Sequence, residues 1–124
     1  MTTNTTSAPK GKSRFPFPRQ SDFEIARNNL ARFKAAEAFW DTYEGNPNPP
    51  GEDIDVTDAI SDAISERIFE TRLTLLLTPT SDAAELHEKL VEIRIGGLTD
   101  GHDCWVDVMK RIEADAKLMA GGAK

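Results

Sequence analysis

The stretch DAISDAISERIFETRLTLLL (58–77) decides the fold. Isoleucine recurs at every fourth position and leucine continues the series, so these side chains share one side of a helix. Acidic residues recur with the same period on the opposite side. The apolar positions are Ile60, Ile64, Ile68 and Leu75, and the acidic positions are Asp58, Asp62 and Glu66. The stretch therefore predicts an amphipathic helix, which we expect to begin near Asp55 or Thr57.

The second half of this stretch changes character, because apolar side chains occupy the side that was acidic. A helix that is apolar all round is usually buried on more than one side. We call the four residues concerned the collar and expect them to lie in the core or in an oligomer interface. They are Phe69, Leu73, Leu76 and Leu77. A strand over RLTLLL (72–77) is the alternative interpretation.

An earlier helix is predicted from Ser21 to about Tyr43. Ser21-Asp22-Phe23-Glu24 fits a capping box, and Gly45 and Pro47 follow in the order expected of a helix end. Apolar residues recur at intervals of three and four, so we expect them to face inward. They are Leu30, Phe33, Ala36, Trp40 and Tyr43.

Two further helices follow. One is predicted from a cap at Thr78 or Asp82 to about Ile95, and Gly96-Gly97 ends it. Another is predicted from Thr99 or Asp100 to Gly121-Gly122. The inward residues should be Ala83, Leu86, Leu90 and Ile93 in the first, and Trp105, Met109, Ile112, Ala116 and Met119 in the second. We therefore predict an all-α fold, a three- to four-helix bundle in a single domain over 21–120, with a frayed tail at 121–124.

Residues 1–20 differ from the rest in composition. They hold three prolines, few aliphatic residues and no acid, which is typical of a disordered basic arm. Their four bases are Lys10, Lys12, Arg14 and Arg19. The chain has one cysteine, no long apolar run and no secretory signal, so we expect a cytoplasmic protein without a membrane span.

The charge is unevenly distributed. The net charge is −6 and residues 1–20 carry +4, so residues 21–124 carry −10. Nine acids and no base lie between Lys34 and Arg67. Phosphates would be repelled by such a body, so the folded part is not expected to bind nucleic acid. The arm leaves a nucleic-acid contact open through its four bases.

Little in the sequence indicates catalysis. Two histidines and one cysteine are too few for a structural zinc site without carboxylates, and HEKLV (87–91) lacks the second histidine of HExxH. His102, Asp103 and Cys104 are the most reactive group, but His102 and Cys104 would point to different sides of a helix. We therefore predict a non-enzymatic protein without a metal or cofactor, and leave open a chemical role for these three residues.

The segments LLLTPTSDAAELHEKL (75–90) and DVMKRIEADAKLMAGG (107–122) resemble small uncharacterised helical proteins of bacterial genomes, prophages and other mobile elements. The resemblance covers roughly 69–122 and is a pattern of helices rather than a catalytic motif. It implies a bacterial or phage accessory protein and brings no substrate.

These observations predict a protein-interaction or accessory protein that presents an acidic helical face to a partner protein. The face would consist of Asp55, Asp58, Asp62 and Glu66. The alternative is a structural protein that forms homo-oligomers through the collar. Two hypotheses remain: the chain is a small enzyme, or it binds nucleic acid through the arm.

Overall fold

The computed structural model describes residues 20–122, and this part of the chain folds into four helices without a strand. The helices are α1 (Asp22–Asp41), α2 (Thr57–Leu77), α3 (Ala83–Gly96) and α4 (Trp105–Gly122). The predicted all-α class is confirmed. The strand alternative for 72–77 is wrong, because these residues continue α2 to its end. The prediction of a disordered arm falls almost entirely on residues outside the described range.

The capping box fixes the start of α1. The hydroxyl of Ser21 accepts the backbone N–H of Glu24 at 3.1 Å, and the Glu24 carboxylate accepts the backbone N–H of Ser21 at 2.8 Å. The first turns then bury Phe23 and Ala26, which we had not placed in the core. The helix ends at Asp41, so Tyr43 lies beyond it and is exposed rather than inward.

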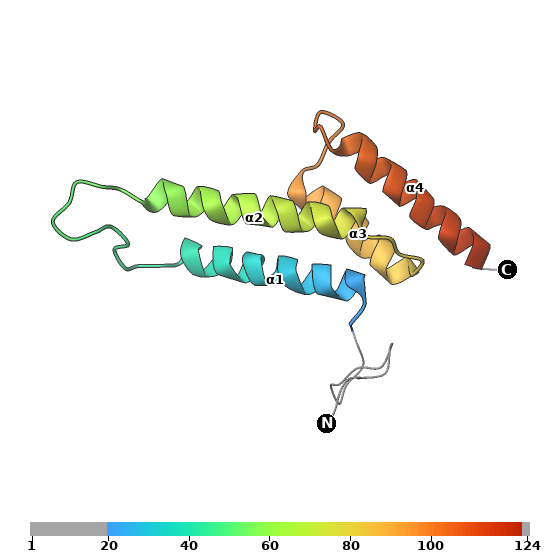
Figure 1. Cartoon of the computed structure of the whole chain (residues 1–124), viewed down its shortest axis with the longest axis horizontal. Coiled ribbons are helices and arrows are strands. Elements are labelled where there is room, and N and C mark those ends of the chain that lie inside the picture. Colours follow the sequence, from blue (N-terminus) through green and yellow to red (C-terminus); the bar gives the residue numbers. More distant parts are fainter. Residues whose placement is uncertain (1–19, 123–124) are drawn as a thin grey trace, which may run out of the picture.

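Helices α1 and α2 run antiparallel and form a long hairpin (Figure 1). Its core lies where Leu30 of α1 meets Ile68 and Leu75 of α2, with Phe33 and Ile64 packed against them. The indole N–H of Trp40 donates to the hydroxyl of Ser61 at 2.8 Å, which ties the two helices together near the far end of the hairpin.

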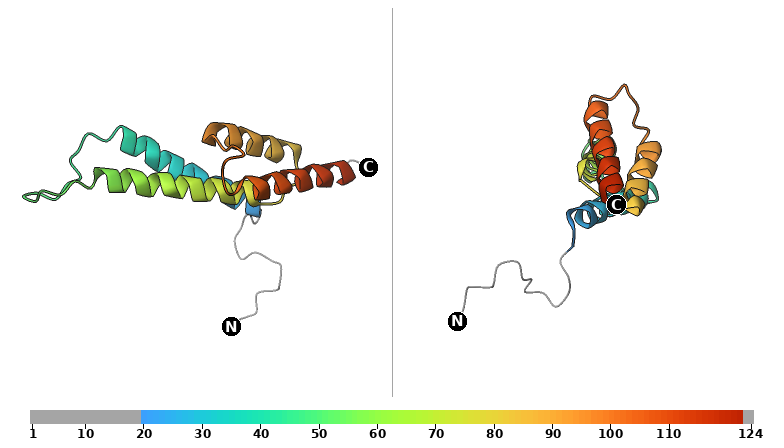
Figure 2. Two further views of the ribbon diagram at one scale, coloured as in Figure 1. Left: turned by 90° about the horizontal axis from the view of Figure 1, so that it is seen from above. Right: turned by 90° about the vertical axis from the view of Figure 1, so that its right-hand side faces the viewer.

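Helices α3 and α4 lie beside only one end of this hairpin (Figures 1 and 2). That end holds the start of α1 and the C-terminal half of α2, where Leu75 and Leu76 are buried. The C-terminal half of α1, the loop 42–56 and the first turns of α2 project beyond them. The projecting end is therefore free of cover by the other two helices.

Ion pairs join α3 to both helices of the hairpin. Glu88 binds Arg27 of α1 at 2.6 Å, and Glu92 binds Lys34 of α1 at 2.6 Å and Arg72 of α2 at 3.0 Å. The face of α3 turned to the hairpin is consequently polar.

Two inward assignments on α3 are wrong. Ala83 is exposed, and the side chain of Leu90 is 47% exposed. The buried residue of this helix is instead Lys89. Hydrophobicity alone could not indicate that a lysine is buried, because the buried charge is stabilised by an ion pair with another helix.

The last helix also differs from its prediction. It begins at Trp105, not at Thr99 or Asp100, because residues 99–104 form a turn in which His102 N–H donates to the carbonyl of Thr99 at 3.0 Å. Val108 is its fully buried apolar residue, whereas Ala116 is exposed. The helix includes both Gly121 and Gly122.

Candidate interaction surface

The acidic segment of the sequence forms the projecting end of the hairpin, which we call the acidic tip (Figure 1). It comprises Glu37, Asp41, Glu44, Glu52, Asp53, Asp55, Asp58, Asp62 and Glu66. All nine side chains are exposed. Since no base lies between Lys34 and Arg67, the tip carries a local charge of −9.

The tip has no counter-charge in the part of the chain that the structure describes. Every ion pair found within residues 20–122 uses other acids, namely Glu70, Glu88, Glu92 and Asp115. The carboxylates of the tip are thus hydrated and available, and their field extends about one Debye length, roughly 8 Å at physiological salt.

The predicted acidic face divides into two parts. Asp58, Asp62 and Glu66 lie one turn apart on α2 and form an exposed row. Asp55 precedes the helix and accepts the backbone N–H of Thr57 at 2.9 Å. This bond, with others from the Thr57 hydroxyl and Asn48, lowers the pKa of Asp55. Asp55 therefore helps to start α2 as well as adding charge.

An aromatic patch lies within the tip. It consists of Phe39, Trp40 and Tyr43, where Trp40 and Tyr43 stack with ring centroids 5.6 Å apart and Phe39 lies 5.7 Å from Tyr43. Phe39 is 66% exposed and Tyr43 is 43% exposed. Trp40 is half-buried and fixed by its bond to Ser61. Aromatic residues are enriched among those that contribute most to the binding energy of protein interfaces.

The loop of the tip is held by side-chain amides. The Asn48 carbonyl accepts the backbone N–H of Val56 at 2.8 Å, and the Asn46 carbonyl accepts the backbone N–H of Asn48 at 3.0 Å. These bonds close a segment that contains three prolines, at 47, 49 and 50. The tip is thus preorganised, which reduces the entropy lost on binding.

The structure separates the residues of the collar. Leu76 is fully buried, Leu73 is half-buried, and Phe69 and Leu77 are 46% and 38% exposed. Leu76 therefore belongs to the interior of the fold. Phe69, Leu73 and Leu77 follow one another at intervals of four and leave an incompletely covered apolar row on α2.

His102, Asp103 and Cys104 do not assemble a reactive centre. The ring of His102 turns back, and its Nδ1 accepts the backbone N–H of Thr99 at 3.1 Å. Cys104 is half-buried, and no thiol–imidazole hydrogen bond joins it to His102 in the described residues. Across residues 20–122, no three His, Cys, Asp or Glu side chains come close enough to hold a metal ion.

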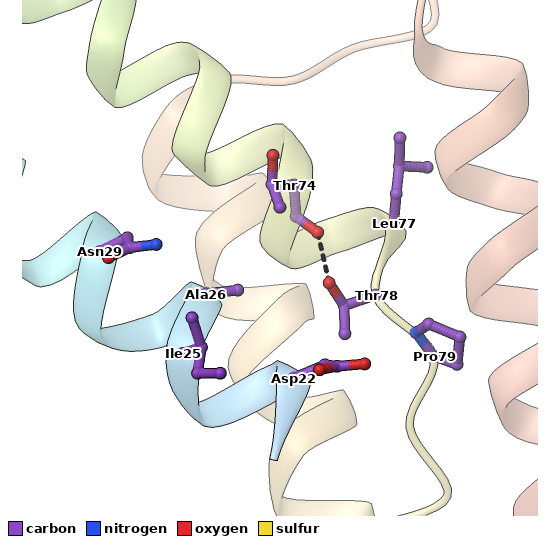
Figure 3. A pocket seen from close by; sticks show the side chains of 8 residues that line it. All are labelled: Asp22, Ile25, Ala26, Asn29, Thr74, Leu77, Thr78 and Pro79. Carbon is purple, nitrogen blue, oxygen red and sulfur yellow. Dashed lines mark hydrogen bonds between the residues drawn. The ribbon is translucent and has the colours of Figure 1, made fainter. Parts of the chain in front are cut away.

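An open groove of about 470 Å³ lies between the start of α1 and the end of α2 (Figure 3). Its lining mixes apolar and polar side chains: Asp22, Ile25 and Asn29 come from α1, and Leu77 lies across from them at the end of α2. Its threonine hydroxyls donate to carbonyls of their own helix: Thr78 bonds the carbonyl of Thr74 at 2.7 Å, and Thr74 bonds that of Glu70. The groove can hold an apolar group, but these residues include no activated nucleophile or base.

A buried polar network was missed by sequence reasoning. Lys89 of α3 and Asp115 of α4 are fully buried and form an ion pair. Asp115 also accepts the Arg111 guanidinium and the backbone N–H of Thr80, each at 3.0 Å, and Lys89 also donates to the carbonyl of Thr78. Burial lowers the pKa of Lys89 and outweighs the opposing attraction of Asp115.

The sequence held a signal for this network. Lys89 is spaced three residues from Leu86 and four from Ile93, and Asp115 is spaced three from Ile112 and four from Met119. Both charges thus occupy positions of an apolar stripe, where a charge is stable only with a partner. Their opposite signs on neighbouring helices could have suggested the pair.

Comparison with known proteins gives no match to a family model, to a curated protein or to a solved structure. None of the helices within 20–122 is both long enough and apolar enough to cross a membrane.

Proposed function

We propose that this chain is a non-enzymatic interaction protein and that its acidic tip binds a basic surface of a partner protein. One observation carries the proposal. Nine exposed carboxylates without a base among them project at the end of a hairpin that α3 and α4 leave uncovered.

The aromatic patch supports the same proposal. A charged surface alone gives fast association and specificity more than affinity. Phe39 and Tyr43 add exposed apolar area in the same segment as the acids, and apolar anchors bordered by polar residues are typical of protein interfaces. The partner would therefore offer an apolar pocket bordered by lysine or arginine.

The acidic row on α2 also carries a stability penalty. Like charges one turn apart destabilise a helix by about 0.2–0.5 kcal/mol per pair. Asp62 is one turn from both Asp58 and Glu66, and no cation offsets either pair within the described residues. Functional surfaces commonly reduce stability in this way, so the penalty supports a role for the row in binding.

The test is affinity capture of basic proteins with three forms of the full chain as bait. The wild type is compared with Asp58→Asn/Asp62→Asn/Glu66→Gln and with the control Asp100→Asn/Asp107→Asn/Glu113→Gln. The control removes the same three charges from exposed positions outside the tip. We expect the wild type and the control to retain the same basic protein at low salt and to release it at high salt. The tip variant should not retain this protein. Equal retention by the tip variant would contradict the proposal.

Self-assembly through the apolar row on α2 is the second candidate function. The partial exposure of Phe69 and Leu77 favours it, because burying such side chains fully stabilises by about 1.5–3 kcal/mol each. Association of this kind would persist at high salt. A monomeric mass by light scattering at micromolar concentration would exclude it.

The bacterial or phage origin suggested by the C-terminal half is also a proposal. It is compatible with an accessory protein that acts by binding. The same capture experiment, carried out in the native host, would identify the partner protein and thereby the biological process in which the chain takes part.

A further inference from the structure

The chain itself contains a segment whose chemistry matches the tip. Residues 10–19, KGKSRFPFPR, carry four bases and no acid, with two phenylalanines between the bases. They lie outside the described residues and precede Gln20 in the chain.

The aromatic patch offers these residues a surface of matching kind. Phe39 and Tyr43 are the exposed rings of the tip, and carboxylates flank them in sequence at Glu37, Asp41 and Glu44. Aromatic rings pair well with further rings in offset or edge-to-face arrangements. A segment with phenylalanines between cations therefore complements a patch with aromatic rings between anions.

The attachment point of the segment determines which tip it can reach. The segment joins α1 at Ser21, at the opposite end of the hairpin from the tip (Figure 1). Along α1, Phe39 lies about 27 Å from Ser21, at 1.5 Å per residue. A fully extended chain spans at most about 3.6 Å per residue, so the Phe17 backbone reaches about 14 Å and the Phe15 backbone about 22 Å. The Phe17 backbone of a fully extended segment therefore ends about 13 Å short of Phe39 along α1, so binding within one chain would need a fully extended segment, whereas the segment of a second copy has no such constraint.

We propose that the aromatic patch and its surrounding acids bind residues 10–19 of a second copy of this chain. The inference rests on the proposed function, since it assigns the basic partner of the same tip. Such a contact joins different surfaces of the two copies, so it is heterologous and links the copies head to tail. Four cations bound by the tip also neutralise part of its charge of −9, which makes the contact sensitive to salt.

The groove in Figure 3 is the competing site for the phenylalanines, since Ile25 and Leu77 lie near the point where the segment joins α1. Docking there would occur within one chain and would not link copies. We favour the tip because the described lining of the groove offers the four bases a single carboxylate, Asp22, whereas the tip offers nine.

The decisive experiment mixes two full-length variants, each defective in one half of the contact. The tip variant is Asp58→Asn/Asp62→Asn/Glu66→Gln, and the arm variant is Lys10→Gln/Lys12→Gln/Arg14→Gln/Arg19→Gln. Sedimentation velocity is recorded for the wild type, for each variant and for their equimolar mixture. The Asp100→Asn/Asp107→Asn/Glu113→Gln protein is the charge control.

We expect the wild type and the charge control to form species larger than a dimer as concentration rises, at about 0.1 M salt and not at about 1 M. Each defective variant should remain monomeric at the concentrations at which the wild type begins to associate. Their mixture should form a one-to-one dimer and stop there, because the dimer holds one intact arm on one intact tip and no second intact pair.

A peptide of residues 10–19 tests the contact directly. Trp105→Phe leaves Trp40 as the single tryptophan, because the chain has two. The peptide should change the fluorescence of Trp40, and the tip variant should bind it about tenfold more weakly, as expected for three exposed charges. A peptide with Phe15 and Phe17 replaced by alanine should also bind more weakly.

A mixture that stays monomeric, or an arm variant that associates like the wild type, would overturn the inference. The proposed function would fail separately, through equal capture of basic proteins by the wild type and the tip variant. Charge-dependent capture by a strictly monomeric wild type would therefore refute the self-contact alone.

Discussion

Lys89 of α3 and Asp115 of α4 form an ion pair in which neither side chain has any exposure to solvent. The two residues differ in the number of further hydrogen bonds that they make. Asp115 also accepts hydrogen bonds from Arg111 and from the backbone N–H of Thr80, whereas the one further partner of Lys89 within residues 20–122 is the carbonyl of Thr78. Removing one partner should thus differ in effect from removing the other.

Asp115→Asn should reduce the free energy of unfolding by about 3–5 kcal/mol, because it leaves the Lys89 ammonium buried without a counter-charge. Lys89→Met should reduce it by about 1–3 kcal/mol, because Asp115 retains Arg111. Urea unfolding measures both. The exposed Lys117→Met, on the same helix as Asp115, is the control and should stay within about 0.5 kcal/mol of the wild type. Equal losses in the two variants would contradict the asymmetry.

Glu92 should make the fold sensitive to acid. Burial raises its pKa, but the hydrogen bonds from Lys34 and Arg72 outweigh burial, so its pKa lies below the ordinary value. The unfolded chain then binds the proton first as pH falls. The ionised Glu92 carboxylate therefore stabilises the fold above about pH 4.3, the pKa of glutamate in an unfolded chain. This stabilisation is lost as the pH falls through the lower pKa that Glu92 has in the folded protein.

The comparison of wild type with Glu92→Gln isolates this effect. At pH 7 the variant should be less stable by about 1–3 kcal/mol, because the neutral amide offers Lys34 and Arg72 a single accepting oxygen in place of two charged ones. The difference should shrink at pH 3. Thermal unfolding at both pH values measures it, and a difference that is independent of pH would refute the assignment.

Ser21→Ala should destabilise α1 by about 1 kcal/mol, because the backbone N–H of Glu24 loses its acceptor. Ser21→Asp retains an acceptor and should restore most of the loss. Circular dichroism during urea unfolding measures both variants. If the alanine and aspartate variants have the same free energy of unfolding, the side-chain hydrogen bond at position 21 does not contribute to stability.

Neutralising the acidic row should stabilise the isolated protein. Asp62→Gln/Glu66→Gln removes the repulsion along α2 and should raise the free energy of unfolding by about 0.5–1 kcal/mol. The gain should decrease with added salt, since these side chains are exposed. Urea unfolding at low and high salt measures it, and a gain unaffected by salt would point to helix propensity instead.

The local features of the fold were readable from the sequence. The capping box at Ser21, the isoleucine period of α2 and the stop at Gly97 each depend on residues within a few positions of one another. Gly97 adopts a φ of 68°, a left-handed conformation that favours glycine. The acidic segment was equally visible as composition.

The position of the helices relative to one another decided which residues are buried between them. Whether Leu90 faces the interior depends on where α2 and α4 lie, and the side of α3 that they enclose holds Lys89 instead. A buried lysine is stable only because Asp115, 26 residues later, lies against it, and no local pattern encodes that proximity.

The sequence by itself determined four amphipathic segments and where their charges fall along the chain, because periodicity and capping are local properties. Only the tertiary structure decided that α3 and α4 cover one end of the hairpin and leave the other end bare. The reason is physical: the covered end buries Leu75 and Leu76 and offers Arg27 and Arg72 to the acids of α3, whereas the acids of the tip have no ion-pair partner among the described residues.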